Sequence, residues 1–381
     1  MPPDGLDESR AVARQAYAAG ALAEAIELQQ TIPRDAWQPD DPLFLGLMLH
    51  ADRRFADATA VLRDGIARFP AHPAMHENLG VLLIAAGDIH GAIAACQNAL
   101  ALGSDSPNVH DCLCDAYNRV GRTDLAVAAG RAALEAKDRL FGARTPLAAI
   151  PSGPPPPFNP HNPAENVIAY GLWGDAPRYC VPLLENARIL PHLFPGWTMR
   201  LYHDASVDPA YLSTLTALGA DLRPMVLPPA VPPPRRLLWR FGVVADPGVR
   251  RFLIRDADSL LSVKERVAVD AWLQSGYHFH AMRDWFTHTD LLLAGLWGGV
   301  GGILPPVETL LDHYTAWRVE NDHVDQDLLA ETVWPAIRRD VLIHDSVFAG
   351  CLGSVRFPPF GALLPGMHIG QNAFHLFTRP G

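Results

Sequence analysis

The feature that most constrains the fold of this chain is a 34-residue period in roughly its first 140 residues. Small residues recur at this interval in three series: Ala58, Ala92 and Ala126; Gly46, Gly80 and Cys114; and Gly65, Ala99 and Ala133. A fixed period of this length is typical of a solenoid, in which each unit buries its apolar face on the next. We therefore predict an all-α solenoid for this part of the chain.

The repeat resembles the tetratricopeptide repeat, whose helix pairs use small residues where the two helices of a unit cross. Gly87 and Gly121 fall where the turn inside each unit needs a residue that tolerates positive φ, and Pro70 ends the first full unit. A degenerate copy over residues 16–26 lies one residue out of phase and is expected to form a capping unit. The resemblance implies three full units and a partial one within residues 1–141.

Prolines mark the next segment. The run from Ile150 to Pro157 contains five prolines among eight residues and cannot continue a helix. Such runs favour extended polyproline II geometry, so residues 142–163 are predicted to be a semi-rigid linker.

After the linker, apolar strand patterns alternate with helical ones. Residues 167–171 and 199–203 are predicted strands, residues 179–193 and 212–218 are predicted helices, and another strand begins at Phe252. This alternation favours a mostly parallel, Rossmann-type sheet covered on both faces. In such sheets ligands bind at the carboxyl ends of the strands.

Two carboxylates stand at one of these predicted strand ends. Asp256 and Asp258 follow the apolar run that begins at Phe252, and alternate residues of an extended strand point to the same side. Converging carboxylates are hard oxygen ligands suited to Mg²⁺ or Mn²⁺, which keep other positions for water and phosphates. The alternative is a pair of solvated acids in a turn.

Composition excludes some classes of function. The net charge of −10 disfavours nucleic acid as a partner, because phosphates are bound mainly by Lys and Arg. The five cysteines form no disulfide framework, which fits a reducing compartment. We see neither a secretion signal at the start nor an uninterrupted apolar stretch long enough to span a membrane, so a cytoplasmic location is expected.

An ordered set of motifs surrounds the two acids. Trp239-Arg240-Phe241 precedes them; Arg283-Asp284, Ala294-Gly295, Asp325-Gln326-Asp327 and His368-Ile369-Gly370 follow. Over residues 166–371 the chain looks like a GT-A-fold glycosyltransferase of the kind grouped in glycosyltransferase family 8 and its relatives. The resemblance implies a GT-A-like catalytic domain over residues 164–381. It also implies transfer of a hexose from a nucleotide-diphosphate sugar, with UDP as the expected nucleotide.

The resemblance assigns roles to individual residues. Asp256, Asp258 and His368 would hold the divalent ion, with His344 as a rival to His368. The expected donor contacts are Tyr170, Arg240, Asp256, Asp258 and Gly295. For Arg240 a guanidinium suits phosphate, although a surface position is the alternative; for His368 the alternative is an ordinary loop histidine.

Three residues are the predicted catalytic group: Gln326, Asp325 and Asp284. Gln326 would lie beside the anomeric carbon, and Asp284 would bind donor-sugar hydroxyls. An amide is a poor nucleophile, so a retaining reaction would proceed on one face of the sugar with help from the departing phosphate. If the reaction inverts configuration, Asp284 or Asp325 is the candidate general base.

The predicted repeats and the predicted catalytic domain together indicate which acceptor this chain would bind. A protein or peptide, or a glycan, is the expected acceptor, because tetratricopeptide-like grooves bind extended or helical segments. A homodimer through the repeats is an open alternative. The competing hypothesis is a catalytically inactive scaffold whose repeats recruit other proteins.

Overall fold

The computed structural model describes residues 3–229, 231–315, 323–361 and 367–378. By its contacts the chain divides into two compact units, Met1–Ala136 and Lys137–Gly381. None of the described helices is both long enough and apolar enough to cross a membrane.

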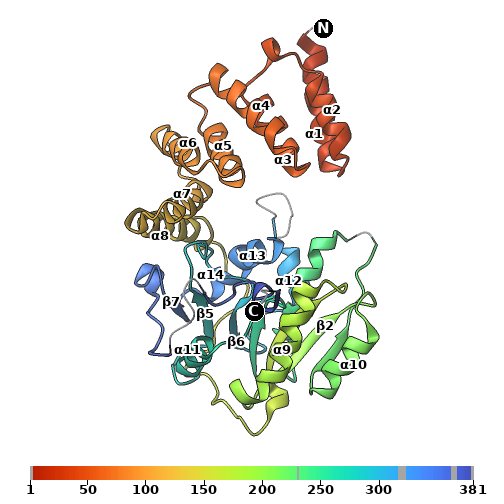
Figure 1. Cartoon of the computed structure of the whole chain (residues 1–381), viewed down its shortest axis with the longest axis vertical. Helices are drawn as coiled ribbons and strands as arrows, with labels where there is room; N and C mark the ends of the chain where they lie inside the picture. The colour runs from red at the N-terminus through yellow and green to blue at the C-terminus, as the bar shows by residue number, and fades with distance from the viewer. Residues whose placement is uncertain (1–2, 230, 316–322, 362–366, 379–381) are drawn as a thin grey trace. The chain divides into compact units, whose positions relative to one another are not determined.

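The first unit is a series of helix pairs. Its elements are α1 (Pro3–Ala18), α2 (Leu22–Gln30), the short 3-10 turn η1 (Arg34–Ala36), α3 (Asp40–Ala51), α4 (Phe55–Arg68), α5 (Pro73–Ala85), α6 (Ile89–Ala101), α7 (Pro107–Arg119) and the part of α8 (Thr123–Phe141) that precedes Lys137. Figure 1 shows the pairs following one another in chain order. The prediction of a tetratricopeptide-like helical domain is confirmed.

The small residues of the repeat lie where the helices pack most closely. A Cβ atom at Gly80 would stand 2.5 Å from Sγ of Cys96, and one at Gly65 would stand 2.7 Å from the ring of Pro42. Gly87 and Gly121 occupy the turns inside their units with φ of +82° and +73°. The period therefore reflects two physical needs, close helix crossing and left-handed turns.

Residues 142–162 contain no helix or strand, as their prolines predict. They are nevertheless bound to the second unit. Leu147 and Ile150 pack on its core, Pro156 accepts a hydrogen bond from Arg251 through its carbonyl oxygen, and Phe158 stacks on Trp197 with ring centroids 5.5 Å apart. The division between the units falls after Ala136, and the segment belongs by its contacts to the second unit.

The second unit is built on a seven-stranded sheet in the order β3-β2-β1-β4-β6-β5-β7. The strands are β1 (Asn166–Leu172), β2 (Thr198–His203), β3 (Asp221–Pro224), β4 (Arg251–Arg255), β5 (Phe279–Arg283), β6 (Leu296–Val300) and β7 (Val341–Asp345). Only β6 runs against its neighbours, β4 and β5. The predicted α/β unit with a mostly parallel sheet is confirmed.

Each face of the sheet has its own core. Along β1, Val167 and Ala169 face a core that includes η3 (Pro233–Val243), α12 (Val307–Asp312), α13 (Val324–Leu328) and α14 (Trp334–Ile337), with a π-helical turn, η4 (Leu329–Val333), between the last two. Ile168 and Tyr170 face the core under α9 (Pro177–Leu193), α10 (Pro209–Ala217) and α11 (Val263–Leu273). This alternation follows from the two-residue period of a strand.

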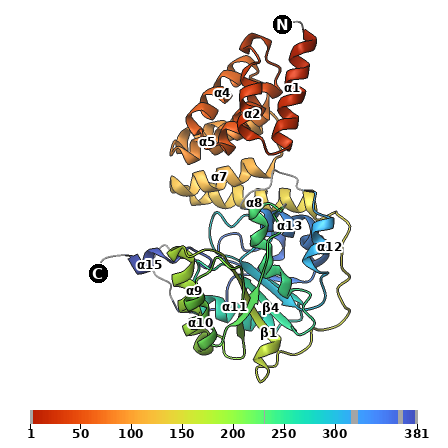
Figure 2. The same ribbon diagram turned by 90° about the vertical axis from the view of Figure 1, so that its right-hand side faces the viewer.

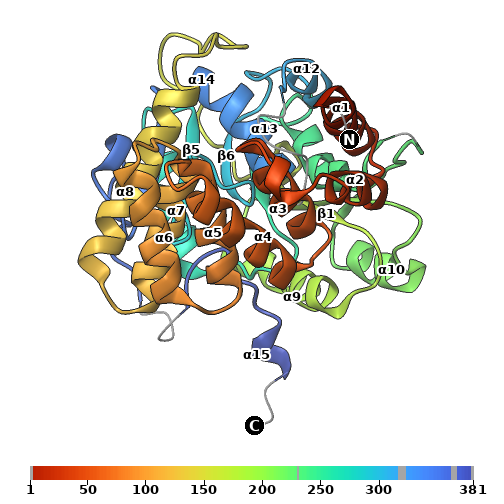
Figure 3. The same cartoon turned by 90° about the horizontal axis from the view of Figure 1, so that it is seen from above.

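Three short elements complete the unit: η2 (Pro163–Glu165) before β1, η5 (Cys351–Gly353) after β7, and α15 (His375–Thr378) near the end of the chain. Helix α15 projects away from the sheet beside α9 (Figures 2 and 3).

Candidate functional site

A cavity of about 730 Å³ lies where the chain reverses its direction of travel across the sheet. From β1 the chain proceeds outward to β2 and β3, then returns to form β4 on the other side of β1. The carboxyl ends of β1 and β4 are therefore adjacent, and Gly171, Asp256 and Asp258 line the cavity there. Ligands of open α/β sheets bind at such switch points.

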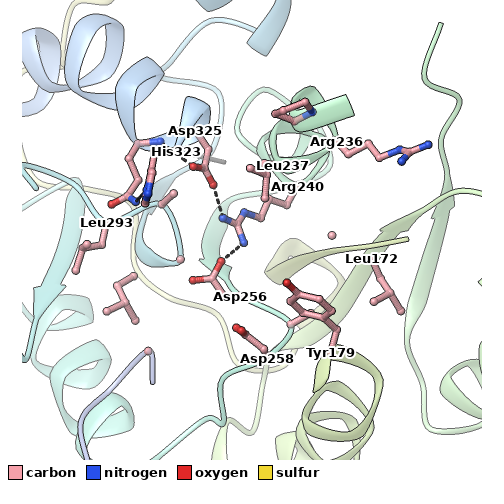
Figure 4. A pocket seen from close by; sticks show the side chains of 18 of the residues that line it. Leu172, Tyr179, Arg236, Leu237, Arg240, Asp256, Asp258, Leu293, His323 and Asp325 are labelled. Atoms are coloured by element: carbon pink, nitrogen blue, oxygen red, sulfur yellow. Dashed lines mark hydrogen bonds and ion pairs between the residues drawn. The ribbon is translucent and has the colours of Figure 1, made fainter. Parts of the chain in front are cut away.

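Arg240 joins two carboxylates at the base of this cavity (Figure 4). Its guanidinium donates to Oδ1 of Asp256, and Nη2 donates to Oδ2 of Asp325 over 2.7 Å. The Arg240 side chain is 5% exposed, so its charge depends on these two partners. The three residues come from η3, the end of β4 and α13.

Asp325 lies at the start of α13 and is almost fully buried. Burial raises its pKa to about 6, and the nearby charge of Asp256 adds to the increase, while Arg240 opposes it. Oδ1 of Asp325 also accepts a hydrogen bond from the backbone N–H of Gln326 over 2.9 Å. A buried carboxyl with this pKa can exchange a proton near neutral pH.

Because the pKa of Asp325 is raised, the difference in unfolding free energy between the wild type and Asp325→Asn should depend on pH. A folded pKa above the ordinary value near 4 means that the folded state binds the proton more tightly. This stabilisation is present below about pH 4 and is lost as the pH rises through about 6. Between those values the wild type should lose about 3 kcal/mol of unfolding free energy relative to Asp325→Asn. Denaturant titrations of both proteins at several pH values measure this difference, and a flat difference would contradict the assignment.

Asp258 faces the same cavity and is held by two other side chains. Its Oδ2 accepts from Nη2 of Arg178 over 3.1 Å and from Nδ2 of Asn372 over 2.9 Å. Burial and the neighbouring charge of Asp256 raise its pKa. The two carboxylates therefore line one cavity, and the charge of Asp256 disfavours the ionised form of Asp258.

Gly295 makes room for Asp256. A Cβ atom at position 295 would stand 1.9 Å from Oδ2 of Asp256, closer than any real contact. The glycine precedes β6, so the antiparallel strand brings its backbone directly against the acid that follows β4. Gly295 lines the cavity, and its close neighbour in the structure is Asp256.

Replacing Gly295 by alanine should therefore displace the Asp256 carboxylate from Arg240. We expect a loss of about 1–3 kcal/mol of unfolding free energy from the overlap. We also expect weaker binding of any ligand that uses Asp256. Gly276→Ala is the matched control, because a Cβ atom there meets nothing within 4 Å. Calorimetry of both variants measures the loss of stability and of ligand binding. Equal losses at the two positions would refute the claim that Gly295 is needed for its close approach to Asp256.

Gln326 contributes an amide to the cavity wall. Its Nε2 lies 3.1 Å from Nδ1 of His323, whereas its Oε1 is buried and has no hydrogen-bond partner among the residues that the structure describes. A buried acceptor without a donor is costly. A ligand hydroxyl in the cavity could supply that donor.

Other lining residues were not predicted from the sequence, in particular Arg178, Arg236, Trp173 and His288. Trp173 follows β1 directly and Arg178 lies at the start of α9, the next element, so the carboxyl end of the first predicted strand was the signal that could have found them. Of the three arginines that line the cavity, Arg178 and Arg240 bind its carboxylates, whereas Arg236 pairs with Asp204. Such a cavity offers donors suited to an anion beside ligands suited to a cation.

Three predicted site residues lie outside the cavity lining: Tyr170, Asp284 and His368. Tyr170 is fully buried in the core under α9, because its position on β1 points it to that face. Burial also raises the pKa of its hydroxyl. Asp284 is 5% exposed and pairs with Lys264, which neutralises it inside the protein. In the structure Tyr170 is therefore a core residue and Asp284 belongs to a buried ion pair.

His368 is also placed differently from its prediction. Its ring stacks on Trp285 with centroids 5.0 Å apart, and it meets His288 edge-on at 5.0 Å. Its rival His344 contacts His280 in a buried pair, with 2.9 Å between His344 Nδ1 and His280 Nε2. Neither histidine is among the residues that line the cavity.

The metal prediction can be tested against this donor set. Within the described residues, no three His, Cys, Asp or Glu side chains are grouped closely enough to hold an ion. Asp256 and Asp258 do line one cavity. Mg²⁺ is often bound by one or two carboxylates together with water and substrate phosphates. The cavity fits that arrangement, and it does not reproduce the three-ligand set with His368.

Comparisons with known proteins give no family. No family model matches the chain, and no curated protein matches it. The solved structure of MamA MSR-1 C2 is 22% identical over 37% of this chain and 82% of its own, with a TM-score of 0.32. A mutant Thermobaculum terrenum O-GlcNAc transferase is 21% identical over 58% of this chain, with a TM-score of 0.37. This chain spans 42% of that transferase. At these scores the likenesses establish neither a fold nor an activity.

Proposed function

We propose that the second unit is a glycosyltransferase of GT-A type that transfers a hexose from a nucleotide-diphosphate sugar, with UDP as the nucleotide. The observation that carries the proposal is the cavity at the reversal of the sheet, where Asp256 and Asp258 face arginine side chains. A nucleotide-diphosphate sugar needs both chemistries, because its phosphates attract guanidinium groups and divalent cations.

The cavity volume supports a ligand of this size. Ligand sites generally occupy about 300–1,000 Å³, and this cavity has about 730 Å³. Its lining also provides apolar side chains from Leu172, Trp173 and Tyr179, beside the charged groups. The same cavity can therefore offer apolar contacts to a nucleoside and charged groups to its phosphates.

The cation in this proposal is Mn²⁺ or Mg²⁺, held by Asp256 and Asp258. It would neutralise the charge that develops on the leaving diphosphate. Arg240 keeps Asp256 beside Asp325, and Arg178 contacts Asp258 from the start of α9. These arginines position the two carboxylates before a ligand arrives.

The proposed reaction retains the configuration of the sugar. The bond between the anomeric carbon and the phosphate oxygen breaks, and its electron pair leaves with the diphosphate. The acceptor hydroxyl forms the new bond on the same face and gives its proton to the departing phosphate oxygen. Gln326 stabilises the charge on the sugar through its buried Oε1, which has no partner among the described residues. If the product is inverted, Asp325 is the base, since Asp284 lies outside the cavity lining.

The acceptor is proposed to be a protein, a peptide or a glycan recruited by the repeats of the first unit. Its exposed apolar side chains include Leu47 and Val81, which occupy equivalent positions in consecutive repeats. Apolar groups at a repeated position can contact a segment bound along several repeats.

The test is a panel of nucleotide sugars incubated with the full chain and Mn²⁺. We expect slow release of nucleotide from one donor without any acceptor, measured by chromatography. Gln326→Ala should reduce this release while leaving nucleotide affinity intact, because its contribution falls on the transition state. No binding of any nucleotide or nucleotide sugar would reject the proposal and favour the scaffold hypothesis.

A further inference from the structure

Asp284 stands at the centre of a buried polar cluster beside the cavity. It follows β5, and its Oδ1 accepts hydrogen bonds from Lys264 of α11 and from Ser346, which follows β7. Lys264 in turn donates to Oγ of Ser346 over 2.9 Å. A buried ion pair with this many partners fixes the geometry of the elements that carry it.

The second oxygen of Asp284 reaches a distant part of the chain. Oδ2 accepts a hydrogen bond from the backbone N–H of Ile369 over 2.8 Å. The Ile369 side chain packs with Ala268, Met282 and Leu296. This carboxylate therefore binds the sheet to the C-terminal segment, which we define as residues 367–373.

The same segment is bound at its other end to the site. Asn372 donates to Oδ2 of Asp258, and the backbone N–H of Ala373 donates to the Asp258 carbonyl oxygen over 2.8 Å. Between these two attachments Gly370 lines the cavity with φ of +79°. The C-terminal segment thus contributes Gly370 to the cavity lining and is held at two points.

Ordinary packing does not require a charge at position 284. Buried ion pairs are weak contributors to stability, and apolar replacements of both partners are often tolerated. What the carboxylate supplies is an acceptor for the Ile369 N–H, which is buried and would otherwise lose its partner. We propose that Asp284 is a positioning residue, which holds the C-terminal segment in place so that Gly370 and Asn372 complete the cavity.

Two double variants isolate that hydrogen bond. Lys264→Met/Asp284→Asn removes both charges but keeps an oxygen that can accept from Ile369. Lys264→Met/Asp284→Ala removes both charges and the acceptor. Methionine retains contact with Phe357 and Phe360, whose rings lie 4.6 and 5.0 Å from the Lys264 nitrogen.

Hydrogen exchange measured by mass spectrometry on the full chain gives a readout that needs no activity. We expect amides of residues 367–373 to exchange about tenfold faster in the alanine double variant than in the asparagine double variant. Peptides from β1 should exchange equally in both. Equal exchange of residues 367–373 in the two variants would overturn the proposal, and so would faster exchange throughout the second unit.

The effect on ligand binding rests on the proposed function and is measured separately, with UDP and Mn²⁺ as the probe. We expect about tenfold weaker affinity in the alanine double variant and rescue by the asparagine. Faster exchange with unchanged affinity would refute the claim that the segment completes the cavity. If the wild type itself does not bind UDP, the proposed function fails, and the exchange comparison alone decides whether Asp284 holds the segment.

Discussion

Asp258→Asn should remove metal-dependent release of nucleotide from the donor while the protein stays folded. The neutral amide cannot offset the charge of a divalent ion, although it can still bond to Arg178 and Asn372. Loss of a metal contact worth several kcal/mol corresponds to a fall of about a hundredfold or more in rate. Nucleotide release with and without Mn²⁺ is the measurement.

The matched control is Asp270→Asn on α11. Asp270 forms an ion pair with Arg266 one turn away and does not line the cavity. That variant should keep the activity and metal requirement of the wild type. Equal activity of the wild type in excess EDTA would contradict the assignment of Asp256 and Asp258 as metal ligands.

Arg240→Met should give the largest loss of stability among single substitutions in the site. It leaves Asp325 buried without its cation, and Asp256 loses the same partner. Breaking a buried pair by removing one partner costs about 3–5 kcal/mol. Equilibrium unfolding in urea measures this loss, and weaker donor binding should accompany it.

A double-mutant cycle separates the free energy of the Arg240–Asp325 ion pair from the free energy contributed by packing of the arginine side chain. Adding Asp325→Asn to Arg240→Met should recover part of the lost stability, because one uncompensated charge disappears. Arg223→Met provides the control: its exposed pair with Asp221 should change stability by less than about 1 kcal/mol. A similar loss at both arginines would show that the buried bridge has no special role.

Some residues of the proposed site could be identified from motifs in the sequence, whereas their contacts with residues far away in the chain could not. Asp256 and Asp258 could be found because an apolar run ends in two acids, and the structure places both acids at the end of β4. Arg240 could be found because its motif precedes them in the ordered set. Its actual partner Asp325 lies 85 residues further along the chain, and no local pattern indicates that contact.

Asp284, Tyr170 and His368 show why the other assignments could not be made from residue type alone. The resemblance assigned Tyr170 to donor binding, Asp284 to the donor-sugar hydroxyls and His368 to the metal ion. Asp284 instead pairs with Lys264 on α11, Tyr170 faces a core, and His368 stacks on Trp285. Each outcome depends on which face of an element packs against another, and this is settled only when the sheet assembles.

The sequence by itself determined the helix pairs, the irregular proline segment and the α/β character of the second unit. These properties can be predicted because they depend on the spacing of apolar and small residues that are near one another in the sequence. Tertiary structure alone decided the strand order and the insertion of antiparallel β6 between β4 and β5. That insertion brings Gly295 against Asp256 and closes the cavity wall. Strand pairing is non-local, because it depends on contacts between segments far apart in the chain, and a one-dimensional pattern does not specify it.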